Sequence, residues 1–335
     1  MTTFSFFPDQ LQFAIHADRT ANGRRQDSNS MAPLPLIEPK QLRDRFLKYI
    51  KVDRFKKLSE SKREEHLHKN FGQNSLTLAE QWYDLCHSDL GAVSLSDKEK
   101  RRGMKMFAVA HYFLWNYCKN AVVLGDRFDM CDDYASGSHL CLWIERIASL
   151  TKKKIKFPKG LKLKDAEIIA LSVDGVDFAT WERKHAKLPV DPKNKTHKYN
   201  HGGLKYQLTL CAQRNQCCDI YGPARGGLQD QTMLEQSEVL EELVGDQLAC
   251  GDRGYIAAKF MKKMTWPNPH DSKAVNNFKS RIRLRHETYH CRMKKYGSMN
   301  QVWRHTIHQH GLAFRAVAVT VQYAWSNGTS IIFSA

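Results

Sequence analysis

Two acidic residues stand at the ends of two apolar runs, where a rigid sheet could hold them for chemistry. The first, Asp174, follows the run Ile168–Val173 and precedes Gly175. The second, Asp252, follows the short run Gln247–Cys250 within the motif Gly-Asp-Arg-Gly-Tyr. Apolar runs rich in β-branched residues favour buried strands. If the two strands are neighbours with their acids at corresponding ends, the two carboxylates lie close together.

Adjacent carboxylates repel each other when both are ionised, and a cation between them removes that repulsion. Hard oxygen ligands favour Mg²⁺ or Mn²⁺ over zinc. Such a pair needs a third acid, and beyond Asp252 the chain has only Asp271 and Glu287. Asp271 lies in a proline-rich loop, whereas Glu287 lies in a predicted helix, about Ala274–Tyr296, with seven lysines and arginines. Glu287 is therefore the candidate third ligand.

Two of these acids, Asp174 and Glu287, have a purely structural alternative. Asp174-Gly175 is also a hairpin signal, with Val176–Trp181 as the returning strand. Glu287 lies four residues after Arg283, and an ion pair at this spacing in a helix is worth roughly a few tenths of a kcal/mol. Neither alternative is excluded by the residues alone.

A zinc site is a rival for the same helix. His286-Glu-Thr-Tyr-His290 matches the His-Glu-x-x-His motif of zinc metalloproteases. No acid follows that could be a third ligand, and the His-x-x-Gly-x-x-His extension fails at Met293 and Tyr296. The remaining candidates are His305, His308 and His310. Because the chain has 15 histidines, such a match arises by chance at roughly the few-per-cent level, and a zinc protease is the less favoured alternative.

The elements around the two strands indicate an α/β domain. Further strands are predicted at Leu204–Cys211 and Cys217–Tyr221, helices at Gln231–Val244, Tyr255–Met264 and Leu312–Tyr323, and a terminal strand at Ile331–Phe333. The predicted order is several strands first and then helices that alternate with a further strand. This order is typical of a mixed sheet with helices on both faces.

The region before the strands carries helical patterns. Residues 1–39 mix polar residues without a period, and we expect them to be disordered. Residues 41–68 predict one or two amphipathic helices with a basic outer face. Two later helices, at about 122–128 and 135–150, are joined by a tight turn and resemble a helix-turn-helix. Its groove contacts would be Ser136, Ser138 and His139, with Arg146 on the DNA backbone, although a helical bundle without a groove role stays open.

The charge of the chain indicates a polyanionic partner. Its 335 residues include 52 Lys and Arg against 35 Asp and Glu, a formal net charge of +17. Nucleic acid is the first candidate for the partner and an acidic membrane surface the second. Residues 151–164 hold seven lysines and no acid, including Lys152, Lys153 and Lys154. This stretch is a candidate domain linker, phosphate-contacting strip or nuclear-import signal.

Composition favours a soluble protein in a reducing compartment. Hydrophobic residues make up 42% and charged residues 26% of the chain, as in ordinary soluble proteins. The nine cysteines contain no Cys-x-x-Cys pair, which argues against a disulfide framework or a structural zinc site. We find neither a signal peptide nor an apolar run long enough for a membrane helix.

Several blocks of the second half resemble the Harbinger-type DDE transposases and their domesticated nuclease relatives. The matching blocks are Ser-Val-Asp-Gly-Val at Asp174, His197–Tyr206, Tyr221–Asp230, Gly-Asp-Arg-Gly-Tyr at Asp252, and Arg-His-Glu followed by Arg-Met-Lys-Lys-Tyr around Glu287. In order and spacing they cover about Ala166 to the C-terminus. His286 beside the glutamate, and Gln229 where the family often has histidine, depart from the pattern.

The resemblance implies an RNase H-like fold with Asp174, Asp252 and Glu287 as a metal-binding catalytic triad. Two Mg²⁺ (or Mn²⁺) ions would activate water or a DNA 3′-hydroxyl and stabilise the leaving oxygen of a phosphodiester. Contacts to DNA or the scissile phosphate would come from Arg253, Arg283, His286 and Arg292, together with Lys152, Lys153 and Lys154.

The implied protein is a nuclear DNA transposase or endonuclease that cleaves at transposon ends and joins 3′-hydroxyls to target DNA. Its partners would be DNA, further copies of the same chain and a separate DNA-binding helper protein. A catalytically silent, transposase-derived DNA-binding protein is the alternative. The domain boundaries that we expect are 1–39 disordered, 40–150 helical and helix-turn-helix-like, 151–164 basic linker, and 165–335 DDE domain.

Overall fold

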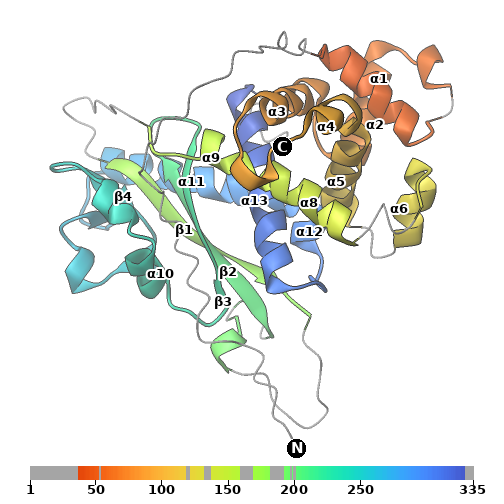
Figure 1. Cartoon of the computed structure of the whole chain (residues 1–335). Helices are drawn as coiled ribbons and strands as arrows, with labels where there is room; N and C mark the ends of the chain where they lie inside the picture. Colours follow the sequence, from red (N-terminus) through yellow and green to blue (C-terminus); the bar gives the residue numbers. More distant parts are fainter. Residues whose placement is uncertain are drawn as a thin grey trace, which may run out of the picture. The chain divides into compact units, whose positions relative to one another are not determined.

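The computed structural model describes residues 37–328, except residues 53, 118–120, 132–136, 159–168, 182–191, 197 and 199–200 and the side chains of residues 121 and 122. Its centre is a five-stranded mixed sheet with strand order β3-β2-β1-β4-β5 (Figure 1). The strands are β1 (Ile169–Ala179), β2 (Gly203–Cys211), β3 (Cys217–Arg225), β4 (Leu248–Cys250) and β5 (Met264–Thr265). β1, β2 and β3 are antiparallel neighbours, whereas β4 runs parallel to β1 and β5 parallel to β4. The predicted mixed α/β sheet is confirmed.

β1 runs straight through the Asp174-Gly175 pair, so the predicted hairpin at this position is wrong. Asp174 lies opposite Leu208 of β2, and Gly175 lies opposite Gln207. Pairing with β2 along the whole length of β1 outweighs the local preference of Asp-Gly for a turn. Glycine here provides space instead, because a Cβ on Gly175 would lie 3.0 Å from Oδ1 of Asp230.

Helices of the second half cover the sheet. They are α10 (Asp230–Gln236), α11 (Lys273–Lys294), α12 (Gly297–Asn300) and α13 (Ile307–Ser326). The predicted long basic helix and the last apolar helix correspond to α11 and α13. The helix predicted at Gln231–Val244 ends at Gln236 and is followed by a 3₁₀ turn, Val239–Glu242. The terminal strand predicted at Ile331–Phe333 lies outside the described residues.

The helix predicted at Tyr255–Met264 is wrong. The chain forms 3₁₀ turns at Arg253–Tyr255 and Ala258–Phe260 and then enters β5. Backbone N–H groups of Ala249 and Gly251 donate to the carbonyls of Lys263 and Thr265. This segment therefore provides hydrogen-bond partners for the edge of β4, whose backbone N–H groups a local helix would leave unpaired.

The two faces of the sheet bury different residues of β1. Val176 and Phe178 join Tyr206 and Phe314 in the core shared with α11 and α13. Leu171 and Val173 pack on the opposite face, in a cluster that includes Leu234 of α10 and Tyr255. Since side chains alternate along a strand, Asp174 lies on the same face as Val176, towards α11.

The first half of the described chain is helical. Its helices are α1 (Pro39–Tyr49), α2 (Glu60–Phe71), α3 (Ser75–His87), α4 (Asp97–Arg102), α5 (Met104–Asn116), α6 (Ala121–Phe128), α8 (Gly137–Ser149) and α9 (Thr151–Lys154). α8 packs against α13 and α5, so these helices share a core with the sheet. Among the described residues, no helix is long and apolar enough to cross a membrane.

The segments predicted as a helix-turn-helix correspond to α6 and α8, but most of the turn between them lies outside the described residues. Ser138 and His139 are exposed at the start of α8. Arg146 was expected on the DNA backbone, and this assignment is wrong because Arg146 is 4% exposed. Its guanidinium pairs with Glu99 at 2.8 Å and donates to the carbonyl of Val93, which fixes α8 against the helices before it.

Candidate active site

The register of the sheet brings Asp174 and Asp252 to the same edge. Ser172 of β1 is paired with Cys250 of β4 in the parallel direction. Asp174 and Asp252 each lie two residues beyond that pair. Because β4 ends at Cys250, its pairing with β1 stops at Ser172, and the next neighbour on this side among the described residues is Trp303, beside Ala179 and Thr180. The expectation that neighbouring strands bring these two acids together is confirmed, but β1 continues to Ala179, so Asp174 lies within its strand rather than at the end.

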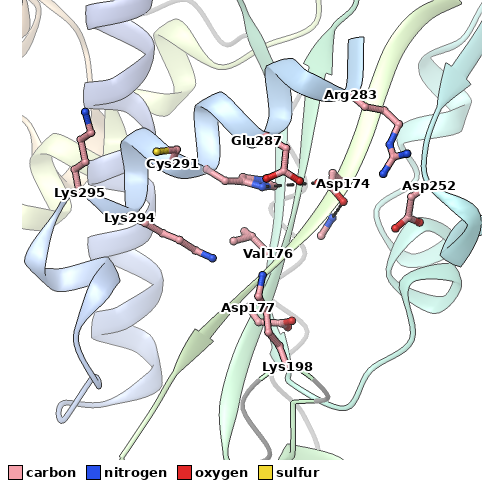
Figure 2. A pocket seen from close by; sticks show the side chains of 12 residues that line it. Asp174, Val176, Asp177, Lys198, Asp252, Arg283, Glu287, Cys291, Lys294 and Lys295 are labelled. Atoms are coloured by element: carbon pink, nitrogen blue, oxygen red, sulfur yellow. Dashed lines mark hydrogen bonds and ion pairs between the residues drawn. The ribbon is translucent and has the colours of Figure 1, made fainter. Parts of the chain in front are cut away.

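A cavity of about 570 Å³ opens at this edge of the sheet, between β1, the turn after β4, and α11 (Figure 2). All three predicted acids, Asp174, Asp252 and Glu287, line it. Figure 2 shows the carboxylate of Glu287 pointing from α11 towards Asp174. The alternative for Glu287, an ion pair with Arg283, is not formed among the described residues.

Electrostatics couple the three acids. The pKa of Asp174 is raised to about 7, mainly by burial and in addition by the nearby charges of Asp252 and Glu287. A hydrogen bond of 2.9 Å from the N–H of Gly175 to Oδ1 of Asp174, and the charge of Arg283, oppose this rise only in part. The positive charge around this half-buried carboxylate therefore does not offset its burial and the two neighbouring acids.

The backbone around Asp252 holds its carboxylate in place. Asp252 caps the 3₁₀ turn that follows it, and its Oδ1 accepts from the N–H of Gly254 at 2.8 Å. A Cβ on Gly254 would lie 3.0 Å from that oxygen and 3.1 Å from Oδ2 of Asp230. The glycine of Gly-Asp-Arg-Gly-Tyr therefore allows two carboxylates to approach the turn closely.

Asp230 is an acid beside the site that was not among the predicted site residues. It forms an ion pair of 2.8 Å with Lys205 of β2, and it lies against Gly175 and Gly254. The buried phenol of Tyr255 is close to the same group. Burial is the largest cause of the raised pKa of Tyr255, and the charges of Asp230, Asp174 and Asp252 raise it further. The signal that could have found Asp230 is its place in the block Tyr221–Asp230.

One face of α11 carries the positive charge of the cavity. Arg283, Glu287 and Lys294 all line it, at the spacing that places residues on one side of a helix. Lys198, Lys295 and the acid Asp177 also line the cavity. The lysines and Asp177 were not predicted, although the helical spacing from Glu287 to Lys294 could have identified Lys294.

Residues 173–322 match the DDE superfamily endonuclease family. The matched segment contains the whole acidic cluster and α11. No curated protein and no solved structure matches the chain. The match supports a transposase- or nuclease-like function for the second half of the chain, and it implies a divalent metal ion and DNA as the substrate.

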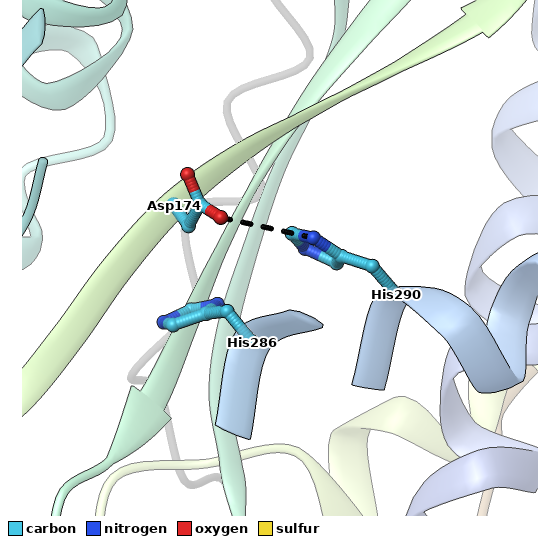
Figure 3. Close-up of side chains that lie close together, drawn as sticks. All are labelled: Asp174, His286 and His290. Atoms are coloured by element: carbon cyan, nitrogen blue, oxygen red, sulfur yellow. Dashed lines mark ion pairs between the residues drawn. The ribbon is translucent and has the colours of Figure 1, made fainter. Parts of the chain in front are cut away.

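Two histidines of α11 lie close to Asp174, and one of them, His290, lines the cavity. His286 and His290, one turn apart on α11, both point towards Asp174 (Figure 3). His286 is 1% exposed, so its assignment as a DNA contact is wrong. It is buried because it lies on the sheet-facing side of α11, while Glu287 is exposed. The pKa of His286 falls to about 4 through burial.

The histidines considered as the third ligand of a zinc protease have other contacts. His310 bonds through Nδ1 to the hydroxyl of Tyr206 at 2.7 Å, and His305 packs between Tyr117 and Trp303. Among the described residues, the only group of three potential metal ligands that includes His286 and His290 is completed by Asp174.

The remaining predicted DNA contacts differ in accessibility. Arg253 and Arg283 are exposed, and Arg283 lines the cavity. Arg292 is half-buried on α11 and does not line the cavity, and its role in DNA binding stays a prediction.

The lysine run of the predicted linker is helical rather than extended. Lys153 of α9 forms an ion pair of 2.5 Å with Asp84, and the ammonium of Lys154 lies 4.3 Å from the ring centre of Tyr323. Lys152 is exposed. Of the three lysines, Lys152 is thus the one best placed for phosphate.

Proposed function

We propose that the cavity is the active site of a Mg²⁺-dependent DDE nuclease in which Asp174, Asp252 and Glu287 hold the metal ions. One observation carries this proposal. Three carboxylates from β1, the β4 turn and α11 line one cavity, and two of them raise the pKa of the third. Such an arrangement is unfavourable unless a cation joins it.

The donor set fits hard divalent ions. Carboxylate oxygens are the ligands that Mg²⁺ and Mn²⁺ prefer, and the three acids supply only such donors. When bound, Mg²⁺ would neutralise the acidic cluster and polarise a phosphodiester, with a second ion assisting the leaving oxygen as in two-metal nucleases.

The chain's own residues have separate tasks in this proposal. Arg283 and Lys294 attract the phosphate backbone to the cavity, where the like charges of the acids alone would repel it. The turn capped by Asp252 and the Lys205–Asp230 ion pair keep the acids in position. Positioning of this kind matters because small misplacements of reacting groups reduce rates strongly.

The proposed reaction is cleavage of DNA at transposon ends and joining of the 3′-hydroxyl to target DNA. The order and spacing of the sequence blocks support a Harbinger-type transposase or its domesticated derivative. Three antiparallel strands followed by two parallel ones support the RNase H-like assignment. The proposal also includes a helix-turn-helix role for α6 and α8 and a nuclear location. It further includes assembly of several copies of the chain and a separate DNA-binding helper protein.

Cleavage of DNA that carries the element's own terminal repeats tests this function. The native protein should nick it in Mg²⁺, whereas Asp174→Asn should not. Asp219→Asn is a matched control. Asp219 is also a largely buried acid of the sheet, whose burial raises its pKa to about 6, but it lies outside the cavity. If native protein and Asp174→Asn give the same products, or neither cleaves, the function is wrong.

A further inference from the structure

Between β1 and α11 lie four buried polar atoms that have no hydrogen-bond partner among the described residues. They are Oγ of Ser172, Nδ1 and Nε2 of His286, and Nε2 of His290. The backbone of Ser172 lies close enough to His286 to favour its protonated form, but no hydrogen bond of standard geometry forms. Buried polar groups are nearly always satisfied in proteins, so a group of four unpaired atoms indicates a ligand.

The geometry of the histidines relative to Asp174 suits a shared ion. One nitrogen of each imidazole and one carboxylate oxygen all lie within 4.8 Å of one another. Nδ1 of His290 is 3.8 Å from Oδ2 of Asp174, too long for a hydrogen bond. Two ligands at about 2.1 Å from one ion stand about 3–3.5 Å apart, so a small side-chain movement would bring both onto one ion.

We propose that Asp174, His286 and His290 form a second metal site, specific for a divalent transition-metal ion such as Zn²⁺ rather than for Mg²⁺. Two imidazole nitrogens and one carboxylate are typical ligands of zinc and related first-row ions, whereas Mg²⁺ prefers oxygen alone.

A second buried histidine environment shows that burial alone does not create such a site. His111 of α5 is fully buried, and both of its ring nitrogens are unpaired. It lies edge-on against Phe107, and it belongs to no group of three potential ligands among the described residues. The pair on α11 differs because its two imidazoles converge on a carboxylate.

The two sites share Asp174, so they compete. A transition-metal ion that is bound by the histidines would withdraw Asp174 from the carboxylate triad, and Zn²⁺ would then inhibit Mg²⁺-dependent cleavage. This consequence rests on the proposed nuclease function, whereas binding of Zn²⁺ by the histidines does not.

Zinc binding to the full-length protein tests the site directly. We expect one tight equivalent of Zn²⁺ by isothermal titration calorimetry, and X-ray absorption spectra of the one-to-one complex that show two imidazole ligands. The spectra need no variant, so they remain decisive if a substitution unfolds the protein. A first shell without imidazole would overturn the proposal.

Variants distinguish this site from the carboxylate triad. His290→Gln should weaken Zn²⁺ binding by roughly 100-fold or more, since even the loss of a group that only supports a ligand costs about 10- to 100-fold. Glu287→Gln should leave Zn²⁺ binding nearly unchanged, and so should His87→Gln, which alters an exposed histidine of α3. Circular dichroism and Tm confirm that each variant is folded.

The outcomes separate the two proposals. If Glu287→Gln weakens Zn²⁺ binding as much as His290→Gln does, the ion lies among the three carboxylates and the histidine site is wrong. If Zn²⁺ binds through the imidazoles but the protein never cleaves DNA, the nuclease function fails and the metal site stands.

Discussion

The cavity face of α11 and the short helix α9 are both strongly basic, but they place their charges in opposite surroundings. On α9, Lys153 pairs with Asp84, and Lys154 lies over the ring of Tyr323. On α11, Arg283 and Lys294 face a cavity in which Asp252 and Glu287 raise the pKa of Asp174. Charge on α9 is therefore used to join helices, whereas among the described residues Arg283 and Lys294 form no ion pair and are available to a ligand. A run of lysines in a sequence does not reveal which of these it is.

The largest effect should come from Asp252→Asn. Loss of one carboxylate from the triad should reduce cleavage by roughly 1,000-fold or more, because a metal ion contributes several kcal/mol to such reactions. Tm should stay the same or rise, since Asp252 repels Asp174. Single-turnover cleavage and thermal unfolding measure the two properties.

Asp84→Asn on α3 is the counterpart of Asp252→Asn. Asp84 accepts from the hydroxyl of Tyr323 at 2.6 Å and pairs with Lys153. This variant should lower Tm and keep cleavage within about twofold, as expected for a residue remote from the chemistry. A loss of activity in Asp84→Asn equal to that in Asp252→Asn would remove the distinction between the two basic regions.

The pH dependence of stability should reveal the free-energy cost of ionising Asp174 in the folded protein. Folding raises the pKa of Asp174 from 3.8 to about 7, so the folded protein binds this proton more tightly than the unfolded chain. The resulting stability is complete below about pH 4 and is lost as the pH rises to 7. Without metal, the native protein should lose about 2–4 kcal/mol over this range relative to Asp174→Asn.

Urea denaturation in a chelating buffer at several pH values measures this difference. Addition of Mg²⁺ at pH 7 should restore stability to the native protein but not to Asp174→Asn. Parallel stability curves for the two proteins would show that Asp174 ionises normally in the folded state.

The grouping of the acids could be predicted from the sequence, because buried strands can be recognised by their apolar runs and parallel neighbours place equivalent positions side by side. Buried apolar runs identified β1, β2 and β4, and the register of β1 and β4 then placed Asp174 beside Asp252. In contrast, the sequence did not show where pairing between distant segments overrides a local preference. Asp-Gly indicated a turn inside β1, and an apolar run indicated a helix where the chain instead protects the edge of β4 with β5.

The histidines show the same limit. His286 and His290 were correctly placed on one face of a helix, but their partner was sought only downstream of Glu287. The carboxylate that meets them, Asp174, comes from a strand far upstream. Sequence spacing describes the neighbours of a residue along one helix, whereas a ligand from another element depends on tertiary packing.

A smaller effect should distinguish Lys294 at the cavity from the exposed Lys152 of α9. Lys294→Ala should lower the cleavage rate at saturating DNA by about 10- to 100-fold, as expected for a cation that acts near the reacting phosphate. Lys152→Ala should leave that rate unchanged and raise the Kd for DNA by about 3- to 10-fold, independently of sequence. Rates and affinities measured on the same DNA at two salt concentrations separate the cases. If Lys152→Ala lowered the cleavage rate as much as Lys294→Ala does, α9 would also reach the scissile phosphate.

The smallest effect should come from Lys153→Met, which keeps the length and apolar stem of the side chain but removes its charge. Lys153 is 43% exposed and Asp84 is 10% exposed, so the ion pair is screened on one side only. Its loss should cost about 0.5–1 kcal/mol, or a decrease in Tm of about 1–3 °C. Cleavage rate and DNA affinity should both match the native protein. A lower DNA affinity at unchanged Tm would instead assign Lys153 to the DNA surface, because the ion pair with Asp84 would then contribute nothing to packing of α9.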